Sequence, residues 1–199
     1  MKLTVIFQFG CRPYIEKIAR DFLKESLGEF DYEFIDLNCS NLTIGAGFNK
    51  LVEQVKTPYV LYTMDDFAFF PNGNWVEKAI GILEKKEDIN IIALRKEKDN
   101  ESPWMIDCRE IVDDISYYRI MRWGNRCFHF SPFLMRTEDL RKIVPLDETD
   151  IHGNIAEASG IEKAQKLNFK EAKLDIPYLG VCFHLGWMRS RVLGWKDRL

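Results

Sequence analysis

The sequence has few cysteines, and none of them form a pair at metal-binding spacing. The five cysteines among 199 residues are odd in number and scattered, with no CxxC motif. A disulfide-stabilised secreted scaffold or a structural zinc site would need paired cysteines. The composition therefore argues against both and favours a reducing, cytoplasmic environment.

An excess of positive charge and a long apolar run are also missing. With 28 Lys and Arg against 31 Asp and Glu, the net charge is −3, so bulk attraction to a nucleic-acid backbone is not expected. No apolar run reaches the roughly 20 residues of a membrane-spanning helix. The last segment, residues 184–199, mixes tryptophan with arginine and lysine. It could contact the inner face of an anionic membrane, or it could be a tail that covers part of the fold.

The glycine-rich loops that bind phosphates are absent as well. Neither GxxxxGK[ST] nor GxGxxG occurs, which argues against P-loop hydrolysis and dinucleotide binding. Residues 7–17, from the end of the first predicted strand into the turn after it, hold one glycine, whereas a nucleotidyltransferase usually has a glycine-rich loop there. Without a repeat or a Pro-rich or Ser-rich linker, the chain is predicted to share one core.

Apolar segments of strand and helix character alternate through the first half of the chain. Strands are predicted at residues 3–9, 31–38, 59–64 and 89–95, and helices at residues 15–27, 45–56 and 75–86. Such alternation indicates an α/β fold with a mainly parallel central sheet flanked by helices. The second half is predicted to hold long loops and a few antiparallel strands up to residue 130, then helices at 138–144 and 154–167 and short strands near 179–185.

Two adjacent aspartates, Asp65 and Asp66, directly follow the apolar strand at residues 59–64. Carboxylates at the edge of a core are costly unless a positive group meets them, and Mg²⁺ or Mn²⁺ would be such a partner. A turn or helix cap is the alternative, because Pro71 and the residues after it indicate a nearby turn. The two residues by themselves leave both interpretations open.

The surrounding segment, GAGFNKLVEQVKTPYVLYTMDDFAFF at residues 45–70, resembles GT-A glycosyltransferases, particularly the inverting family 2 enzymes. In these proteins a Gly/Ala-rich helix with an Asn leads to a hydrophobic strand and a metal-binding DxD-type motif. The first strand with its Arg-containing turn, the segment FHFSPFLMRTEDL and the late FHLGW follow in the family's order. The resemblance implies one GT-A domain over residues 1–199, with a nucleotide-sugar-binding half at about 1–95 and an acceptor-binding half at about 96–199.

The resemblance implies a donor site built around a divalent cation. Asp65 would face the ribose and the metal shell, and Asp66 would ligate Mn²⁺ or Mg²⁺ at the diphosphate. His184 would be a further metal ligand, although a lone histidine beside apolar residues is also typical of a core. Arg12 would neutralise phosphate oxygens, or it is an ordinary exposed arginine.

The nucleotide itself is less defined by the sequence. Asp36 matches the first of two acidic residues that commonly end the family's second strand, but Leu37 replaces the second, and Asn38 could substitute for it. The sequence therefore leaves the identity of the nucleotide base open. The nucleotide-sugar-binding residues that the resemblance implies are Gln8, Arg12, Asp36, Asn38, Asn49 and Asp65.

Inverting transfer needs a general base to take the proton of the attacking hydroxyl. Glu157 lies where the family's acidic helix presents this carboxylate, and its alternative role is to stabilise the first turn of that helix. Glu162 is expected to be structural, and Asp150 is a second candidate base. Trp123 could bind the acceptor, since sugars stack on aromatic side chains.

These features predict a metal-dependent inverting glycosyltransferase. It would move a sugar from a nucleoside-diphosphate sugar to a hydroxyl of a glycan or a lipid-linked acceptor. The alternatives are a catalytically silent carbohydrate- or nucleotide-binding domain of the same fold and a nucleotidyltransferase. Because a fold alone does not establish activity, the metal and base residues carry the prediction.

Overall fold

The computed structural model describes residues 2–10, 12–71, 74–94, 106–121, 128–150, 153–176 and 181–185. The strands are β1 (Leu3–Phe9), β2 (Tyr32–Asn38), β3 (Tyr59–Met64), β4 (Phe67–Phe69), β5 (Ile91–Ala93), β6 (Ile106–Val112), β7 (Ile115–Met121), β8 (Phe133–Arg136), β9 (Glu171–Leu174) and β10 (Cys182–His184). The helices are α1 (Pro13–Leu27), α2 (Ile44–Gln54), α3 (Trp75–Lys85), α4 (Thr137–Ile143) and α5 (Asn154–Lys166).

The described strands form an eight-stranded sheet in the order β2-β1-β3-β8-β5-β9-β7-β6, and β4 pairs separately with β10. Strands β1, β2 and β3 are parallel, β8 runs opposite to β3 and β5, and β9 is parallel to β5. Strand β7 reverses again and β6 returns to the first direction. Six of the eight strands therefore share one direction, which confirms the predicted mainly parallel α/β sheet.

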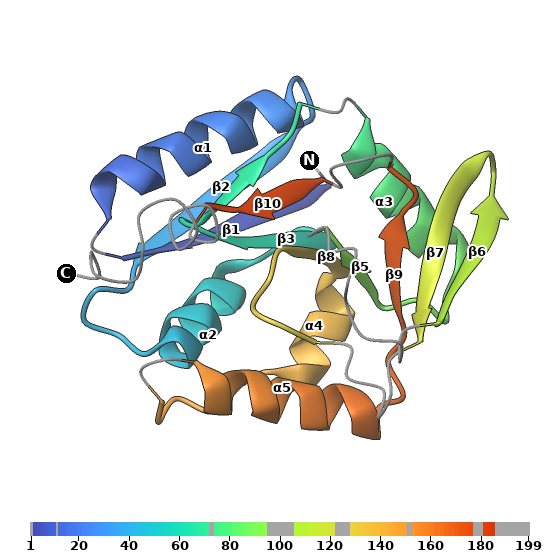
Figure 1. The fold of residues 1–199 in the computed structure, drawn as a ribbon. Helices are drawn as coiled ribbons and strands as arrows, with labels where there is room; N and C mark the ends of the chain where they lie inside the picture. Colours follow the sequence, from blue (N-terminus) through green and yellow to red (C-terminus); the bar gives the residue numbers. More distant parts are fainter. Residues whose placement is uncertain are drawn as a thin grey trace.

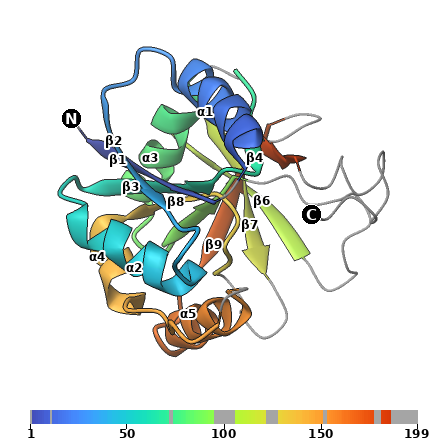
Figure 2. The ribbon, with the colours of Figure 1, turned by 90° about the vertical axis from the view of Figure 1, so that its left-hand side faces the viewer.

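Helices cover both faces of this sheet, as Figures 1 and 2 show from two directions. Helices α1 and α3 pack on one face with β4 and β10, and α2, α4 and α5 lie on the other. In β1, Val5 and Phe7 belong to the first core, whereas Ile6 belongs to the second. A strand buried on both faces has no polar side to expose, which explains why residues 3–9 are mostly apolar, with Thr4 and Gln8 as buried polar exceptions.

The ends of the helices follow from local chemistry. Helix α1 begins at Pro13, whose fixed φ suits the first turn, and ends before Gly28, which has a φ of 56°. Helix α2 begins after Thr43, whose Oγ1 accepts a hydrogen bond from the backbone N–H of Ala46 at 3.1 Å. These helices confirm the predicted positions to within a few residues.

The second half of the chain contains the expected antiparallel strands. Strands β6 and β7 form a hairpin whose turn residues, Asp113 and Asp114, have φ values of 44° and 64°. Strands β4, β8 and β9 were not predicted from the sequence. Within the described residues no helix is long and apolar enough to cross a bilayer.

Candidate active site

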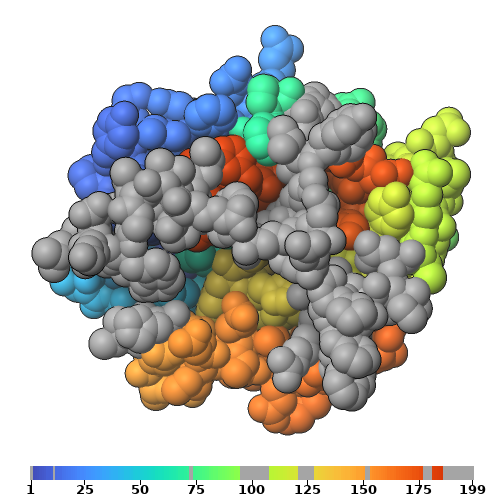
Figure 3. All heavy atoms as spheres, viewed as in Figure 1, coloured from blue at the N-terminus to red at the C-terminus, as the bar shows by residue number. Residues whose placement is uncertain are grey.

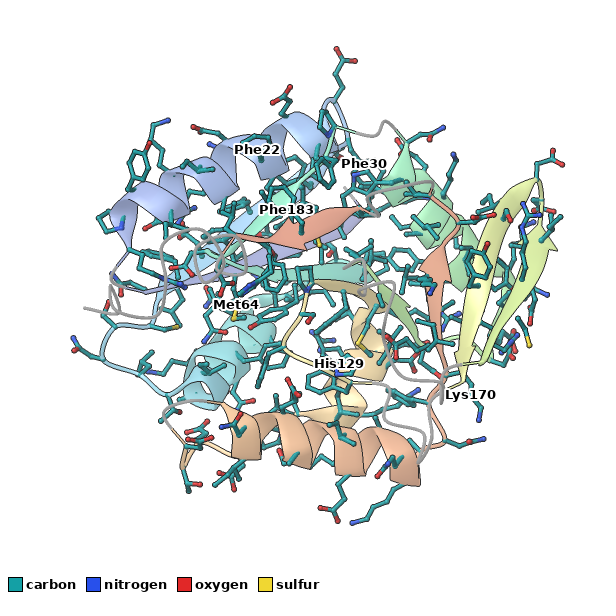
Figure 4. All side chains as sticks on the ribbon, in the orientation of Figure 1. Phe22, Phe30, Met64, His129, Lys170 and Phe183 are labelled. Carbon is teal, nitrogen blue, oxygen red and sulfur yellow. The ribbon has the colours of Figure 1, made fainter. Side chains whose placement is uncertain are left out.

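The candidate site lies where β1 and β3 end side by side. The backbone N–H of Asp65 donates to the carbonyl oxygen of Gln8 at 3.1 Å, which continues the β1–β3 pairing up to the two aspartates. Met64, just before them, packs against both cores, and Figure 4 shows it at this edge of the sheet. The carboxyl ends of parallel strands are where open α/β sheets commonly bind ligands.

Asp65 is the more buried of the two aspartates. The residue is 2% exposed, and its carboxylate accepts a hydrogen bond from the backbone N–H of Gly10 at 3.0 Å. Its other oxygen accepts a hydrogen bond from Arg12. Burial raises the pKa of Asp65, although Gly10 and Arg12 oppose that shift.

Asp66 lies beside a histidine that is 118 positions away in the sequence. His184 Nε2 is 3.0 Å from Asp66 Oδ2. Asp66 Oδ1 is buried and has no hydrogen-bond partner among the described residues. Burial by itself would raise the pKa of Asp66, but the hydrogen bond and charge of His184, together with Arg12, lower it.

The β4–β10 pair brings His184 to this position. In the antiparallel register His184 lies opposite Phe67, and the two rings are 5.0 Å apart in an edge-on arrangement. The backbone N–H of Leu185 also donates to the carbonyl oxygen of Asp66 at 2.6 Å. The structure thus places the predicted Asp66 and His184 together.

Arg12 contacts both aspartates from the start of α1. Besides its hydrogen bond to Asp65, its Nη2 is 3.7 Å from Asp66 Oδ2. The side chain of Arg12 is 43% exposed and makes no capping hydrogen bond to the helix. The predicted Arg12 therefore lies at the site as a partly exposed cation.

Gln8 lies beneath the site and has both ends of its amide engaged. Its Nε2 donates to the carbonyl oxygen of Ile44 at 3.0 Å, and its Oε1 accepts from the Tyr62 hydroxyl at 3.0 Å. A Cβ atom on Gly47 would come within 2.7 Å of Gln8 Nε2. Gln8 thus links β1 and β3 to α2, and direct contact with a nucleotide stays a prediction.

Asn49 joins α2 to the loop that leads into α5. Its carboxamide accepts a hydrogen bond from the Leu146 backbone N–H at 2.8 Å and donates to the Leu146 carbonyl oxygen at 3.0 Å and to Glu148 Oε1 at 2.8 Å. A Cβ atom on Gly45 would be 2.0 Å from the carbonyl oxygen of Asp147. The Gly/Ala-rich motif with its asparagine therefore lets α2 approach this loop closely, and a nucleotide contact by Asn49 stays a prediction.

Glu157 lies in the first turn of α5, and one of its carboxylate oxygens is held by the backbone. Phe130 N–H donates to Glu157 Oε2 at 2.9 Å, and the side chain is half-buried. Figure 4 shows His129, the neighbour of Phe130, next to α5. In the space-filling view α1 and α5 lie along opposite margins of this face of the molecule (Figure 3).

The buried Tyr62 hydroxyl connects Glu157 electrostatically with the two aspartates. Burial raises the pKa of Tyr62 well above its usual value, and the negative charges of Asp66 and Glu157 raise it further. These carboxylates therefore act on one common neighbour. Phe130, whose N–H holds Glu157, also packs against Tyr62, with their ring centroids 5.9 Å apart.

Asp36 and Asn38 lie at the end of β2. Asp36 pairs with Arg20 at 2.6 Å, and the Arg20 guanidinium also lies 4.5 Å from the ring centre of Phe7. Asn38 is exposed, and its Oδ1 accepts hydrogen bonds from the Ser40 backbone N–H at 2.9 Å and from its hydroxyl at 2.6 Å. The sequence analysis missed Arg20, although its spacing of four residues from Glu16 on one helix is a recognisable ion-pair signal.

Two of the remaining sequence candidates, Glu162 and Asp150, lie on or just before α5. Glu162 is exposed and pairs with Lys166 at 2.6 Å, as expected for a structural residue. Asp150 Oδ2 accepts the Ile155 backbone N–H at 3.1 Å near the start of α5. Trp123 and the tail at residues 186–199 lie outside the described residues.

The donor groups at this site suit a divalent cation with few protein ligands. Asp66 offers a buried oxygen without a hydrogen-bond partner, and His184 offers an adjacent imidazole. In the part of the chain that the structure describes, no three His, Cys, Asp or Glu side chains are arranged to hold an ion. Asp66 and His184 are thus the described residues that could ligate an ion such as Mg²⁺ or Mn²⁺, which takes one or two protein ligands and completes its shell with phosphate oxygens and water.

Solved structures with the same fold include glycosyltransferases. The chain superposes on an N-terminal fragment of TarS from S. aureus with a TM-score of 0.64 and 12% identity, covering 92% of this chain and 60% of that one. For a complex of that fragment with UDP-GlcNAc, the TM-score is 0.62 and the identity 14%, and the match covers 92% of this chain and 58% of that one. For Drosophila β-1,4-galactosyltransferase 7 in complex with manganese, UDP-Gal and xylobiose, the TM-score is 0.57 and the identity 9%, and the match covers 92% of this chain and 70% of that one. The chain thus spans about three fifths of the TarS fragment.

The sequence comparisons identify the family. No curated protein matches the chain. The family model described as glycosyl transferase family 2 matches residues 10–144, which is more than half of the chain and includes Arg12, Asn49 and both aspartates. This protein therefore belongs to glycosyl transferase family 2.

Proposed function

We propose that this protein is a metal-dependent inverting glycosyltransferase that moves a sugar from a nucleoside-diphosphate sugar to a hydroxyl of a glycan or lipid-linked acceptor. Membership of glycosyl transferase family 2 supports the reaction class. The observation that carries the proposal is the meeting of Asp66 and His184, 118 positions apart, next to Arg12 at the carboxyl end of β3.

The donor diphosphate would bind at this end of the sheet. Asp66 and His184 would hold Mn²⁺ or Mg²⁺, which when bound stabilises the negative charge of the departing diphosphate. Arg12 would donate hydrogen bonds to phosphate oxygens, because its planar guanidinium suits bidentate contacts. Asn38, which is exposed at the end of β2, would contact the nucleoside, and Asp65 would contact the ribose.

The acceptor hydroxyl would be activated by Glu157. The Phe130 N–H fixes one carboxylate oxygen, which orients the group and leaves the other oxygen to accept the proton. The donor would bind mainly to residues 1–95 and the acceptor to residues 96–199. Because β8 from the second half lies between β3 and β5, both halves would share one sheet at the site.

Two sets of variants test this proposal. A thermal-shift panel with UDP, GDP, dTDP and CDP, each with and without Mn²⁺, should identify one nucleotide that stabilises the parent only when Mn²⁺ is present. UDP is the first candidate because structures of the same fold bind UDP-sugars. The Asp66→Ala variant should lose the Mn²⁺-dependent shift. No shift with any of the four nucleotides would refute the donor assignment.

A comparison of two glutamate variants on α5 tests the assignment of Glu157 as the general base. Release of UDP from UDP-GlcNAc and UDP-galactose is measured with water or xylobiose as the acceptor. Glu157→Gln should lower the rate by about 100-fold while the nucleotide shift remains. Glu162→Gln changes the same chemical group on the exposed side of the same helix and should keep the parent rate. Equal rates in both variants would exclude Glu157 as the base.

A further inference from the structure

We propose that Arg12 is an internal counter-ion of the Asp65–Asp66 pair and makes binding of the divalent cation depend on binding of the donor. Without donor, its guanidinium would compensate the two carboxylates and compete with the cation. With donor, the guanidinium would turn to the diphosphate and release the carboxylates. This inference rests on the proposed function, because it concerns regulation at the same site.

The charges at the site require a compensating group. Asp65 and Asp66 are adjacent, and their side chains are 3% and 15% exposed. His184 contacts Asp66. Among the ion pairs of the described residues, Arg12 is the basic side chain that reaches Asp65, and it also approaches Asp66 Oδ2 at 3.7 Å. Two buried carboxylates without such a partner would be costly, so Arg12 stabilises the pair.

Arg12 is exposed enough to exchange its partner for a phosphate group. Its side chain is 43% exposed, and it makes no capping hydrogen bond at the start of α1. When Arg12 moves away, Asp65 keeps the hydrogen bond from the Gly10 N–H. Because Pro13 fixes the first turn of the helix, the movement requires only the arginine side chain to change its conformation.

The chemistry of arginine makes this a competition between cations. A guanidinium keeps its charge at any ordinary pH, so only another partner can remove it from the carboxylates. A cation that approaches Asp66 alone must therefore act against this positive charge. A diphosphate offers the guanidinium bidentate oxygen acceptors, so nucleotide and cation should each increase the affinity for the other by the same factor.

A Mn²⁺ titration without nucleotide tests this inference. Free Mn²⁺ is followed by electron paramagnetic resonance in the parent, Arg12→Gln and Lys17→Gln. Lys17 is a matched control because it also lies on α1, is 76% exposed and pairs with Asp21 rather than with the site. Arg12→Gln should bind Mn²⁺ about tenfold more tightly than the parent, within the usual range of coupled sites. Lys17→Gln should match the parent.

Repeating the titration with UDP measures the coupling. UDP should tighten Mn²⁺ binding in the parent and in Lys17→Gln, and much less in Arg12→Gln. If Arg12→Gln does not fold, as thermal melting would reveal, Arg12→Lys replaces it. The lysine has a single compact charge that cannot span both carboxylates, so this variant should also bind Mn²⁺ alone more tightly than the parent.

The outcomes separate this inference from the proposed function. Equal affinities of the parent and the folded Arg12 variant for Mn²⁺ alone would overturn the counter-ion role, even if UDP binds. Tighter Mn²⁺ binding in the variant supports that role even if no nucleotide stabilises any of the proteins. A lack of stabilisation by any nucleotide would refute only the assignment of the donor site.

Discussion

Replacing Asn49 with alanine tests whether this residue supports the loop before α5 or contacts the nucleotide. The substitution removes the carboxamide that accepts from Leu146 N–H and donates to the Leu146 carbonyl oxygen and to Glu148 Oε1. Asn49 is 6% exposed, so water does not readily replace it. The two Leu146 backbone groups would be left without their present partner.

The expected loss of stability follows from these contacts. A buried polar group that loses its partner costs about 1–3 kcal/mol, so with two such groups the unfolding free energy should fall by at least about 2 kcal/mol. A domain with an ordinary unfolding free energy of about 5–15 kcal/mol remains folded after such a loss. The loop that enters α5 should loosen, and because α5 carries Glu157, sugar transfer should weaken more than nucleotide binding.

Urea denaturation followed by circular dichroism measures the stability, and thermal shift with UDP and Mn²⁺ measures nucleotide binding. Gln54→Ala is the control, because Gln54 lies on the same helix, is exposed and donates to its own helix at the Lys50 carbonyl oxygen at 2.9 Å. Its effect should stay within about 0.5 kcal/mol. If Asn49→Ala is as stable as Gln54→Ala but no longer binds UDP, Asn49 is a nucleotide ligand and the supporting role is wrong.

The remaining predictions concern packing and pH. Gly45→Ala should destabilise the fold by more than about 2 kcal/mol, because its Cβ would lie 2.0 Å from the Asp147 carbonyl oxygen. Gly81→Ala, whose Cβ would meet only the end of the Ile115 side chain at 3.0 Å, should be close to neutral in the same urea titration. Hydrogen bonds from Arg119 and Tyr117 lower the pKa of Glu110 from 4.5 to about 2. This carboxylate therefore stabilises the fold above pH 4.5, and that contribution is lost as the pH falls towards 2. Glu110→Gln should be less stable than the parent at pH 7, and the difference should shrink between pH 4.5 and 2; a constant difference would contradict the assignment.

The fold of the first half could be predicted because its signals are local. Residues 3–9 and 59–64 are apolar on both faces, and the helices between them have a regular apolar face and clear ends. Strands β4, β8 and β9 contain only three or four residues each, too few to show a periodicity. Strand β8 also runs against its neighbours β3 and β5, and this depends on long-range pairing that composition does not encode.

The kinds of side chain at the candidate site could be predicted from the sequence, but their spatial partners could be predicted only in part. The position of Asp65 and Asp66 after a buried strand indicated a ligand-binding edge, since the carboxyl ends of parallel strands gather there. The proximity of His184 depends on the pairing of two three-residue strands, β4 and β10. The sequence indicates the second of them, as a short strand near residues 179–185, but not β4 or the pairing between the two. For Gln8 and Asn49 the sequence reveals a polar residue in an apolar context, but the partner of a buried amide is decided by tertiary packing.

The buried amides of Gln8 and Asn49 connect the candidate donor site with the loop before the helix that carries the candidate base. Gln8 links β1 and β3 to the start of α2, and Asn49, on the same helix, links α2 to the loop before α5. Glycines at 45 and 47 permit both approaches, because a Cβ at either position would overlap a neighbouring atom. Helix α2 thus contacts β3, the strand that precedes Asp65 and Asp66, on one side and the loop before α5 on the other. The distance between the proposed cation site and the candidate base Glu157 should therefore depend on small and buried polar residues of this helix, which do not themselves need to touch the substrate.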